Sequence, residues 1–378
     1  MEKSIEKKRV GLITMHRVLN FGSALQTYAL QRKVRELGYN CEVIDYIYPN
    51  NRHCIKESIL KRVKQKARFI ISNVFWGFPD FIKRKRFQAF SKRFLSLSPR
   101  TYSSYEDIHD NSPSYDIYLT GSDQVWNPLY VKDDTTFFLS FCKKIHASRI
   151  SFASSFSTTR IPKEFRKLYA RHLSRFDRIS VREHSGIGLV ADLTGQRAEV
   201  VCDPTLLLNE SEWSKLAEYS RIEVKQPYIL AYVLDYAFNP HPQIDDMITR
   251  IQKELKMPVI CLDGRLADYM KKDARVIKNA GPCDFVRLVK HASFVVTTSF
   301  HGTAFALNFS KPFYSVIVNT EKQDRILSLL RLADARDRAR SVTDTTIEMT
   351  PMDYAPIARS LNHLRDRSAS FLKEALAG

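Results

Sequence analysis

The chain has 378 residues, of which 44% are hydrophobic and 26% charged, and its formal net charge is +18. This length exceeds what one hydrophobic core usually holds, so we expect two domains, and the composition excludes a disordered or fibrous protein. The longest uncharged stretch of the aromatic middle region, 69–79, is far shorter than the ~20 residues that cross a bilayer. The apolar run at 10–15 is too short for a signal peptide, so we expect a cytoplasmic protein.

The predicted elements of the first half alternate between strands and helices. Apolar runs at 10–14 and 41–46 predict two buried strands. Between them, apolar residues near a 3.6-residue spacing predict a helix that follows the loop Asn20-Phe-Gly-Ser and ends at Gly38. A strand, a helix and a strand of this span are typical of a parallel βαβ unit. Further short strands are expected at 115–120, 150–153, 178–181 and 199–202.

A second α/β series follows a polar linker at 209–226. Strands are expected at 228–233, 259–262, 294–298 and 313–318, and helices at about 242–256, 283–292, 302–309 and 323–332. Two such series predict two Rossmann-like domains that face each other across a cleft, as in the GT-B arrangement, with substrates at the carboxyl ends of the strands. We expect domains at 1–210 and 226–345, and a C-terminal helix at 350–378 that packs back on the first domain.

The positive charge is concentrated in a basic helical insertion at about 54–100. Residues 51–100 contain fourteen lysines and arginines but only two acids, a local balance of +12. The second of two expected helices carries Phe87, Phe90 and Phe94 on one face, beside the basic run 83–86. Such a helix can pack its aromatic face on the domain, or it can lie on an anionic membrane through 56–94. Nucleic acid is not expected as a partner, because no recognised nucleic-acid motif accompanies the charge.

The strongest chemical motif is Thr-Ser-Phe-His-Gly-Thr at 298–303. A buried strand ends there and leads into a helix, which places His301 at the carboxyl edge of a sheet. Gly302 lets the backbone approach a ligand, and the amides at the start of the next helix favour an anion. His301 is therefore a candidate acid or base acting on a phosphorylated compound, although a loop histidine can also be purely structural.

Three other motifs follow strands of the first series. Arg178 begins the strand Arg-Ile-Ser-Val and Arg182 follows it. An arginine at a strand end suits a carboxylate or phosphate, although a surface salt bridge from Arg182 to Glu183 or another acid is an equal alternative. Ser122, Asp123 and Gln124 form a polar turn that can hydrogen-bond sugar hydroxyls or serve only the fold. Asn20 and Gly22 lie in a loop that lacks the dinucleotide-binding glycine spacing.

Other cofactor and metal signatures are missing. The six cysteines are widely spaced with no Cys-x-x-Cys pair, so neither a zinc site nor a disulfide framework is expected. The sequence has no Asp-x-Asp pair, no His-Glu-x-x-His and no phosphate-binding Gly-Lys-Ser/Thr loop. We therefore expect no metal and no cofactor.

Taken in order, these motifs resemble those of the polysaccharide pyruvyl transferase family. The resemblance covers about 8–332 and rests on the loop at 20–31, the segment 115–128, Ser-Val-Arg-Glu at 180–183, Asp-Pro-Thr-Leu-Leu at 203–207 and the His301 motif. It implies an enzyme that transfers pyruvate from phosphoenolpyruvate, as co-substrate, to sugar hydroxyls of a polysaccharide unit, forming a ketal. The acceptor unit is commonly linked to a membrane polyprenyl diphosphate, which gives the basic insertion a role at the inner face of the cytoplasmic membrane.

The resemblance also implies roles for individual residues. His301 and Asp123 become the catalytic candidates. Some relatives carry arginine two residues before the motif histidine, where this chain has Ser299. Donor binding is therefore expected from Arg182, Arg178, Ser299, Gly302, Thr303, Arg325 and Lys311, and acceptor binding from Asn20, Gly22, Ser122 and Gln124.

Two rival functions remain at this stage. A GT-B glycosyltransferase that uses a nucleotide sugar would share the architecture. A non-catalytic carbohydrate-binding protein of the assembly machinery would share the sugar-facing turns but would not need His301.

Overall fold

The computed structural model describes residues 7–48, 78–234, 239–263, 274–317, 324–344, 347 and 351–378, with the side chains of residues 78 and 79 left aside. These residues divide into two compact units. The first comprises 7–48, Ser91–Leu207 and Leu364–Gly378, and the second comprises 78–90 and Leu208–His363. Each unit is described by itself below.

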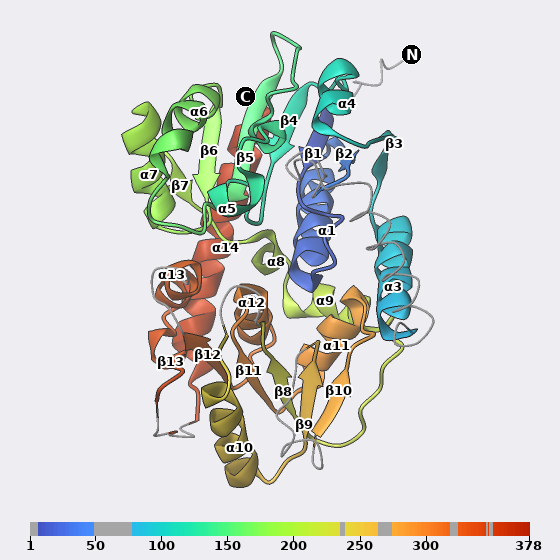
Figure 1. Cartoon of the computed structure of the whole chain (residues 1–378), viewed down its shortest axis with the longest axis vertical. Helices are drawn as coiled ribbons and strands as arrows, with labels where there is room; N and C mark the ends of the chain where they lie inside the picture. The colour runs from blue at the N-terminus through green and yellow to red at the C-terminus, as the bar shows by residue number, and fades with distance from the viewer. Residues whose placement is uncertain are drawn as a thin grey trace, which may run out of the picture. The chain divides into compact units, whose positions relative to one another are not determined.

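The first unit is built on a seven-stranded parallel sheet with the order β3-β2-β1-β4-β5-β6-β7 in the described part of the chain (Figure 1). Its strands are β1 (Arg9–Ile13), β2 (Asn40–Tyr46), β3 (Leu97–Tyr102), β4 (Ile117–Thr120), β5 (Ser148–Ser154), β6 (Arg178–Val181) and β7 (Glu199–Val200). Strand β4 is buried throughout and β5 is buried from Ile150 onward, as expected of a parallel sheet covered on both faces.

Helices and short turns connect these strands. They are α1 (Phe21–Glu36), α4 (Tyr105–Asp110), α5 (Pro128–Val131), the 3₁₀ turn η2 (Thr136–Phe138), α6 (Lys163–Leu173), α7 (Ser185–Thr194) and α8 (Pro204–Leu207). Asn20 precedes helix α1, and its side chain caps the helix by accepting from the backbone N–H of Ser23. The helix ends before Gly38, which has a φ of 94°. Trp126 packs against Phe138, Phe156 and Phe176 in the core of this unit.

The second unit contains a six-stranded parallel sheet with the order β10-β9-β8-β11-β12-β13 among the described residues. The strands are β8 (Ile229–Tyr232), β9 (Val259–Leu262), β10 (Ala274–Ile277), β11 (Phe294–Thr297), β12 (Phe313–Ile317) and β13 (Ala339–Ser341). The helices are α9 (Glu210–Ala217), α10 (Gln243–Leu255), α11 (Pro282–His291), α12 (Phe300–Asn308), α13 (Asp324–Leu332) and the 3₁₀ turn η4 (Arg336–Arg338). The prediction of two successive Rossmann-like α/β domains is confirmed.

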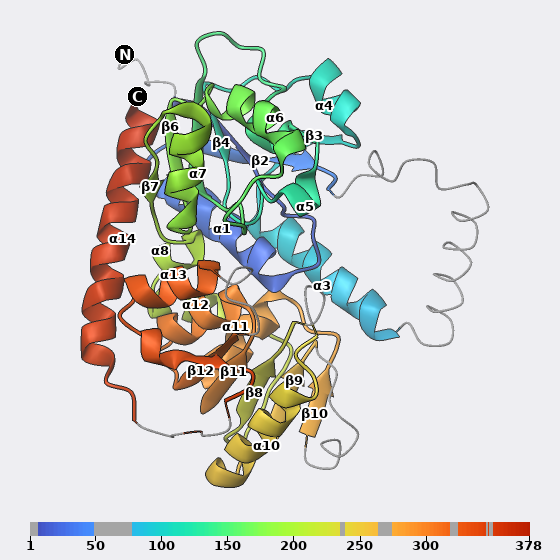
Figure 2. The same ribbon diagram turned by 60° about the vertical axis from the view of Figure 1, so that its left-hand side comes forward.

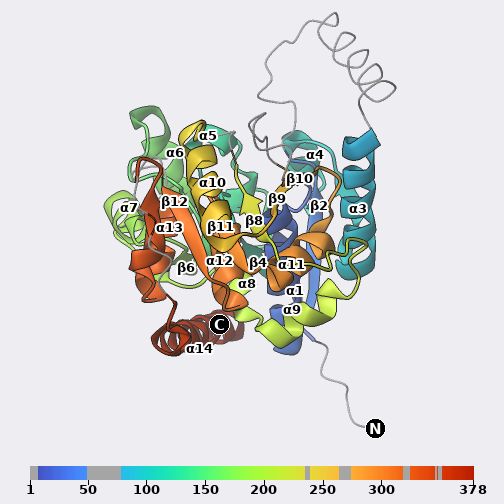
Figure 3. The ribbon, with the colours of Figure 1, turned by 90° about the horizontal axis from the view of Figure 1, so that it is seen from below.

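Two helices contribute residues to both units. Helix α14 (Tyr354–Ala377) is continuous in Figure 2, and its residues belong to the second unit up to His363 and to the first from Leu364. In the first unit, the Ser368 hydroxyl of α14 accepts a hydrogen bond from the backbone N–H of Cys202, at 2.8 Å. Helix α3 (Phe78–Phe94) is likewise uninterrupted in Figure 3.

Helix α3 corresponds to part of the predicted basic insertion, of which residues 54–77 lie outside the described part of the chain. Phe87 and Phe90 are buried, as the packing alternative expected. The helical segment ends at Phe94 rather than near 100, because residues 97–102 pair with β2 as strand β3.

Two basic residues of α3 form ion pairs within the second unit. Lys83 contacts the carboxylate of Asp263, and Arg86 Nη1 donates to Asp284 Oδ2 at 2.8 Å. Asp284 also accepts hydrogen bonds from the backbone N–H groups of Gly281 and Arg221 and from the Ser220 hydroxyl, each at 2.8 Å. Part of the basic run 83–86 therefore stabilises the fold.

Candidate functional site

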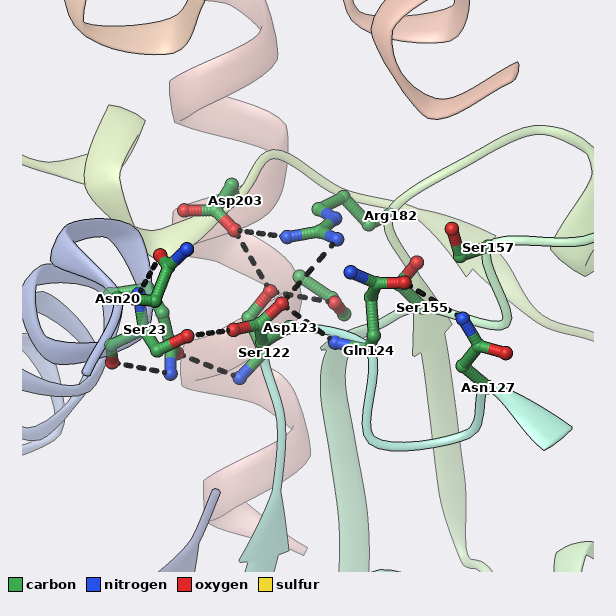
Figure 4. Close-up of polar contacts among 12 residues, drawn as sticks. Asn20, Ser23, Ser122, Asp123, Gln124, Asn127, Ser155, Ser157, Arg182 and Asp203 are labelled. Carbon is green, nitrogen blue, oxygen red and sulfur yellow. Dashed lines mark hydrogen bonds and ion pairs between the residues drawn. The ribbon is translucent and has the colours of Figure 1, made fainter. Parts of the chain in front are cut away.

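Polar residues from four strand ends gather at the carboxyl edge of the first sheet. Asn20 follows β1, Asp123 follows β4, Arg182 follows β6 and Asp203 follows β7 (Figure 4). Strand β1 lies between β2 and β4, so the chain order reverses at this point of the sheet. Such a reversal is where ligands bind in open α/β sheets. The sequence-predicted acceptor residues and Asp123 are therefore brought to the expected edge.

Asp123 is buried and held from both sides. Its Oδ2 accepts a short hydrogen bond from the hydroxyl of Ser23, which lies in the first turn of α1. Its Oδ1 accepts from the backbone N–H of Gln124 at 2.8 Å and lies 3.9 Å from Arg182 Nη2. These contacts fix the orientation of the carboxylate, which is a requirement for a general base.

Arg182 forms a buried ion pair with Asp203, not with Glu183. Arg182 Nη1 lies 2.9 Å from Asp203 Oδ2, and the side chains are 1% and 0% exposed. Asp203 Oδ2 also accepts from the Ser122 hydroxyl at 3.0 Å, and Oδ1 accepts from the Thr205 hydroxyl at 2.7 Å. In this group of contacts one guanidinium faces two carboxylates, those of Asp203 and Asp123. We call Ser23, Ser122, Asp123, Arg182 and Asp203 the Asp123 cluster.

The backbone of the turn after β4 is fixed by α1. Gln26 Oε1 accepts from the backbone N–H of Ser122 at 3.0 Å, and Gln26 Nε2 donates to the Thr14 hydroxyl at 2.8 Å. The Thr14 hydroxyl donates in turn to the carbonyl of Ser122 at 3.1 Å. Gly121 has a φ of 114°, and a Cβ there would overlap the carbonyl oxygen of Phe152. Only glycine suits this position.

The other predicted acceptor residues take part in local contacts at the same edge. Asn20 caps α1, and Gly22 is buried in the first turn of that helix. The side-chain oxygen of Gln124 accepts a hydrogen bond from Asn127 Nδ2 at 2.8 Å. These contacts fix the side-chain amides of Asn20 and Gln124. Binding of a sugar by these groups stays a prediction.

Sequence reasoning did not single out Glu183 as a site residue. Glu183 is buried, and its Oε1 accepts hydrogen bonds from the Ser155 hydroxyl and from the backbone N–H groups of Phe156 and Ser157, at 2.8–3.0 Å. The backbone N–H of Ser155 in turn donates to the carbonyl of Asp123 at 2.9 Å. The sequence signal for Glu183 was its position directly after Arg182. In the structure, the carboxylate of Glu183 holds the loop at 155–157, beside Asp123.

A second group that the sequence did not reveal is centred on Asp45, at the end of β2. Asp45 accepts hydrogen bonds from His16 Nε2 at 3.0 Å, from Arg17 Nε at 2.7 Å and from the Thr101 hydroxyl at 2.6 Å. Burial alone would raise the pKa of Asp45, but the bonds from His16, Arg17 and Thr101 outweigh it and hold the pKa well below its usual range. The loop between β1 and α1 is thereby fastened to the neighbouring strands.

In the second unit, residues 297–303 form what we call the His301 turn, which runs from the last residue of β11 into the first turn of α12. The Ser299 hydroxyl caps α12 by accepting from the backbone N–H of Gly302 at 3.3 Å. Thr297 Oγ1 accepts from the backbone N–H of Ser299 at 3.0 Å. A Cβ at Gly302 would overlap Thr297 Oγ1, so the turn needs glycine there. His301 is 6% exposed and lies in the first helical turn.

The His301 turn lies at the order reversal of the second sheet. Strand β8 lies between β9 and β11, and the Thr298 hydroxyl accepts from the backbone N–H of Leu234, beyond the end of β8, at 2.8 Å. The Thr303 hydroxyl lies 2.6 Å from that of Ser315 in β12. Ser299, His301, Gly302 and Thr303 are thus brought together at a carboxyl edge.

Three predicted donor-binding residues are placed differently. Arg325 lies in the first turn of α13, after the carboxyl end of β12 and so at the same edge as the His301 turn. Lys311 precedes β12, at the opposite edge of the second sheet. Arg178 is exposed at the start of β6, at the opposite end of that strand from Arg182. The structure therefore brings Arg325 to the relevant edge but not Lys311 or Arg178.

The searched portion of the chain offers no ready metal site and no membrane span. No group of three histidine, cysteine or acidic residues that could hold a metal ion occurs among the described residues. Within the same residues, every helix is too short or too polar to pass through a lipid bilayer.

Two parallel α/β sheets, each with polar residues at its order reversal, define a GT-B-like protein. The family model described as polysaccharide pyruvyl transferase matches residues 20–320. The chain belongs to the polysaccharide pyruvyl transferase family, and the match includes the Asp123 cluster and the His301 turn but not Arg325.

Solved structures share the fold at low sequence identity. The UDP-GlcNAc 2-epimerase of Methanocaldococcus jannaschii aligns with a TM-score of 0.53 and 11% identity, covering 94% of this chain and 92% of the epimerase. Arabidopsis thaliana UGT89C1, solved with UDP-L-rhamnose, aligns with a TM-score of 0.51 and 9% identity, covering 98% and 94%. A comparison with curated proteins found no match.

Proposed function

We propose that this protein is an enzyme that transfers pyruvate from phosphoenolpyruvate to hydroxyls of a sugar in a polysaccharide unit, forming a pyruvate ketal. The observation that carries the proposal is the family match over 20–320, which contains both ordered polar groups. The likeness to sugar-nucleotide enzymes concerns the fold alone, so a glycosyltransferase gains no separate support.

The proposed reaction balances without a redox partner. Protonation of the methylene carbon of phosphoenolpyruvate makes C2 electrophilic, and one sugar hydroxyl adds there. The bond from C2 to the phosphate oxygen breaks, and a second hydroxyl closes the ketal. The two hydroxyl protons correspond to the one gained by the new methyl group and the one carried away by hydrogen phosphate. The enzyme must therefore supply a proton, accept protons and stabilise anions.

We assign proton transfer to His301 and Asp123. His301 lies at the start of a nine-residue helix, where backbone N–H groups favour an anionic donor. Ser299, Gly302 and Thr303 shape that helix start, and Arg325 lies at the same sheet edge. These positions support a donor role for the His301 turn.

Asp123 is assigned to the acceptor hydroxyl. Its carboxylate is oriented by Ser23 and the Gln124 backbone, and Arg182 lies nearby. Since Arg182 already pairs with Asp203, we propose that it orients Asp123 in addition to any contact with the donor carboxylate or phosphate. Asn20, Gly22, Ser122 and Gln124 would line the acceptor side.

We also propose that the protein works in the cytoplasm and docks on the anionic inner face of the membrane, where a polyprenyl-linked acceptor would be presented. Lys85 and Lys92 of α3 are exposed, and Phe81 is 53% exposed on the same helix. An exposed face with cations and an aromatic ring suits an anionic lipid surface. Phe87 and Phe90 are buried and would not insert.

The test is phosphate release from phosphoenolpyruvate in the presence of a chelator and a panel of galactosides, mannosides and N-acetylhexosaminides. We expect sugar-dependent release by the wild type, and a loss of about 10²–10⁴-fold in kcat for both His301→Ala and Asp123→Asn. The surface variant Asp192→Asn serves as a control with unchanged release. No release with any acceptor, together with turnover of a nucleotide sugar, would replace this proposal with the glycosyltransferase.

A further inference from the structure

A cavity of about 320 Å³ opens at the amino edge of the second sheet. It lies between the coil at 222–225, which precedes β8, and the last turns of α11. Basic side chains of Lys225, Arg287 and His291 line it, together with the apolar side chains of Ile222 and Leu288 and the ring of Tyr228. The Tyr228 hydroxyl donates to the carbonyl of Leu288 at 2.7 Å, which fixes this wall.

This cavity is separate from the proposed donor site. His291 directly precedes β11, and His301 follows the same strand. The two histidines therefore lie at opposite edges of one sheet. A ligand in the cavity would not occupy the His301 turn.

Within the described part of the chain, the lining of the cavity holds two permanent cations, Lys225 and Arg287, against one acid, Glu223. No ion pair joins Lys225, Arg287 or His291 to a carboxylate among the residues that the structure describes, although Glu223 also lines the cavity. In the same unit, Lys83 and Arg86 each have a carboxylate partner. Burial and the positive charges of Arg287, Lys290 and Lys311 lower the pKa of His291. The cavity therefore has a positive potential that a bound anion would relieve.

The dipole of α11 accounts for only part of this charge. Lys290 and His291 lie in the last turn, where cations interact favourably with the carboxyl end of a helix. Arg287 lies one turn earlier and is half-buried, and Lys225 comes from the coil before β8. A favourable interaction with the carboxyl end of α11 therefore does not account for the charges of Arg287 and Lys225.

We propose that this cavity binds the phosphate or diphosphate group of a ligand that also has a small apolar part. The planar guanidinium of Arg287 suits phosphate oxygens, and Lys225 adds a second cation. Ile222 and Leu288 offer an apolar wall, and the volume lies at the lower end of the range of small-molecule sites, roughly 300–1,000 Å³. The phosphate can belong to a soluble metabolite or to a lipid headgroup.

The first experiment titrates full-length protein with inorganic pyrophosphate and follows the imidazole resonance of His291 by NMR. Binding should raise the pKa of His291, because an anion favours its protonated form. Calorimetry should show that Arg287→Ala weakens pyrophosphate binding by about tenfold or more. Lys253→Ala, which removes one exposed cation from α10, should bind like the wild type. An unmoved His291 resonance, or equal affinity in Arg287→Ala, would exclude a soluble phosphate as the ligand of this cavity.

A second arm distinguishes the two sources of phosphate. Vesicles that contain phosphatidic acid are titrated against the wild type and Arg287→Ala. If vesicle binding depends on Arg287, the cavity is assigned to a lipid headgroup. If pyrophosphate binding depends on Arg287 but vesicle binding does not, the cavity is assigned to a soluble phosphate. Failure of both probes to respond to Arg287→Ala refutes the site. None of these measurements uses pyruvyl transfer, so the result is independent of the proposed function.

Discussion

Asp203 holds the guanidinium of Arg182 through an ion pair of 2.9 Å between two fully buried side chains. The carboxylate of Asp203 is shared with the hydroxyls of Ser122 and Thr205, so four residues from three strand ends are joined. Arg182 thus has a fixed orientation toward Asp123 within the first unit, whatever ligand it also meets.

Removal of the Asp203 charge should destabilise the protein strongly. Asp203→Asn leaves the guanidinium of Arg182 buried without its partner, which costs about 3–5 kcal/mol of unfolding free energy. Urea unfolding measures the effect. Asp192→Asn breaks an ion pair with Arg166 at the surface and should cost less than about 1 kcal/mol. Equal losses in the two variants would contradict the role of the buried pair.

Gly121→Ala should unfold the turn that carries Asp123. The residue needs a φ of 114°, and the Cβ of alanine would overlap the carbonyl oxygen of Phe152. We therefore expect the free energy of unfolding to fall by about 2 kcal/mol or more. The matched control is Gly188→Ala in α7, where a Cβ meets open space. That change should raise stability by about 0.5–1 kcal/mol. Thermal unfolding of both variants decides whether the backbone at Gly121 is as constrained as described.

His172 should make stability depend on pH in the mildly acidic range. Burial, and then the charges of Arg175 and Arg171, lower the pKa of His172 to about 4. An unfolded histidine has a pKa of about 6.5, so the unfolded state binds more protons between these values. The stability that the neutral form of His172 contributes is therefore fully present above about pH 6.5, and it is lost as the pH drops toward about 4. The free energy of unfolding of His172→Gln should fall less steeply over this range than that of the wild type. Parallel curves of unfolding free energy against pH would contradict the assignment.

Membrane docking by α3 should depend on its exposed cations. Lys85→Glu with Lys92→Glu should abolish binding to vesicles rich in anionic lipid and leave the melting temperature close to that of the wild type. Arg86→Glu should instead lower the melting temperature, since Arg86 pairs with Asp284. Vesicle sedimentation and thermal unfolding separate the two effects. Unchanged sedimentation of the double variant would refute docking through α3.

Much of the fold follows from apolar runs in the sequence. Strands β8, β9 and β11 are buried throughout and β1 is buried after Arg9, so their apolar residues are consecutive and easily seen. Strands β3, β10 and β13 were not predicted. All three lie at sheet edges, where exposed residues such as Arg100, Arg275 and Ser341 interrupt the apolar run.

The candidate site was predictable only in part. Asn20, Asp123 and His301 follow buried strands, and the carboxyl ends of such strands meet at one edge, so their placement could be expected. The pairing of Arg182 with Asp203 depends on which strands are neighbours, which no local pattern reveals. Lys311 precedes β12 and Arg178 is the first residue of β6. Both therefore lie at the other edge of their sheets, a distinction that residue type alone does not make.

Asp284 has a further consequence for motion. Its carboxylate joins helix α3, the coil at Ser220 and Arg221, and the start of α11, three stretches that are distant in sequence. When the hydrogen bonds and the ion pair of this carboxylate break, all three stretches lose a stabilising contact at the same time. Backbone amides in these stretches should therefore exchange with deuterium as one cooperative opening unit, although local helix strength would favour three different rates.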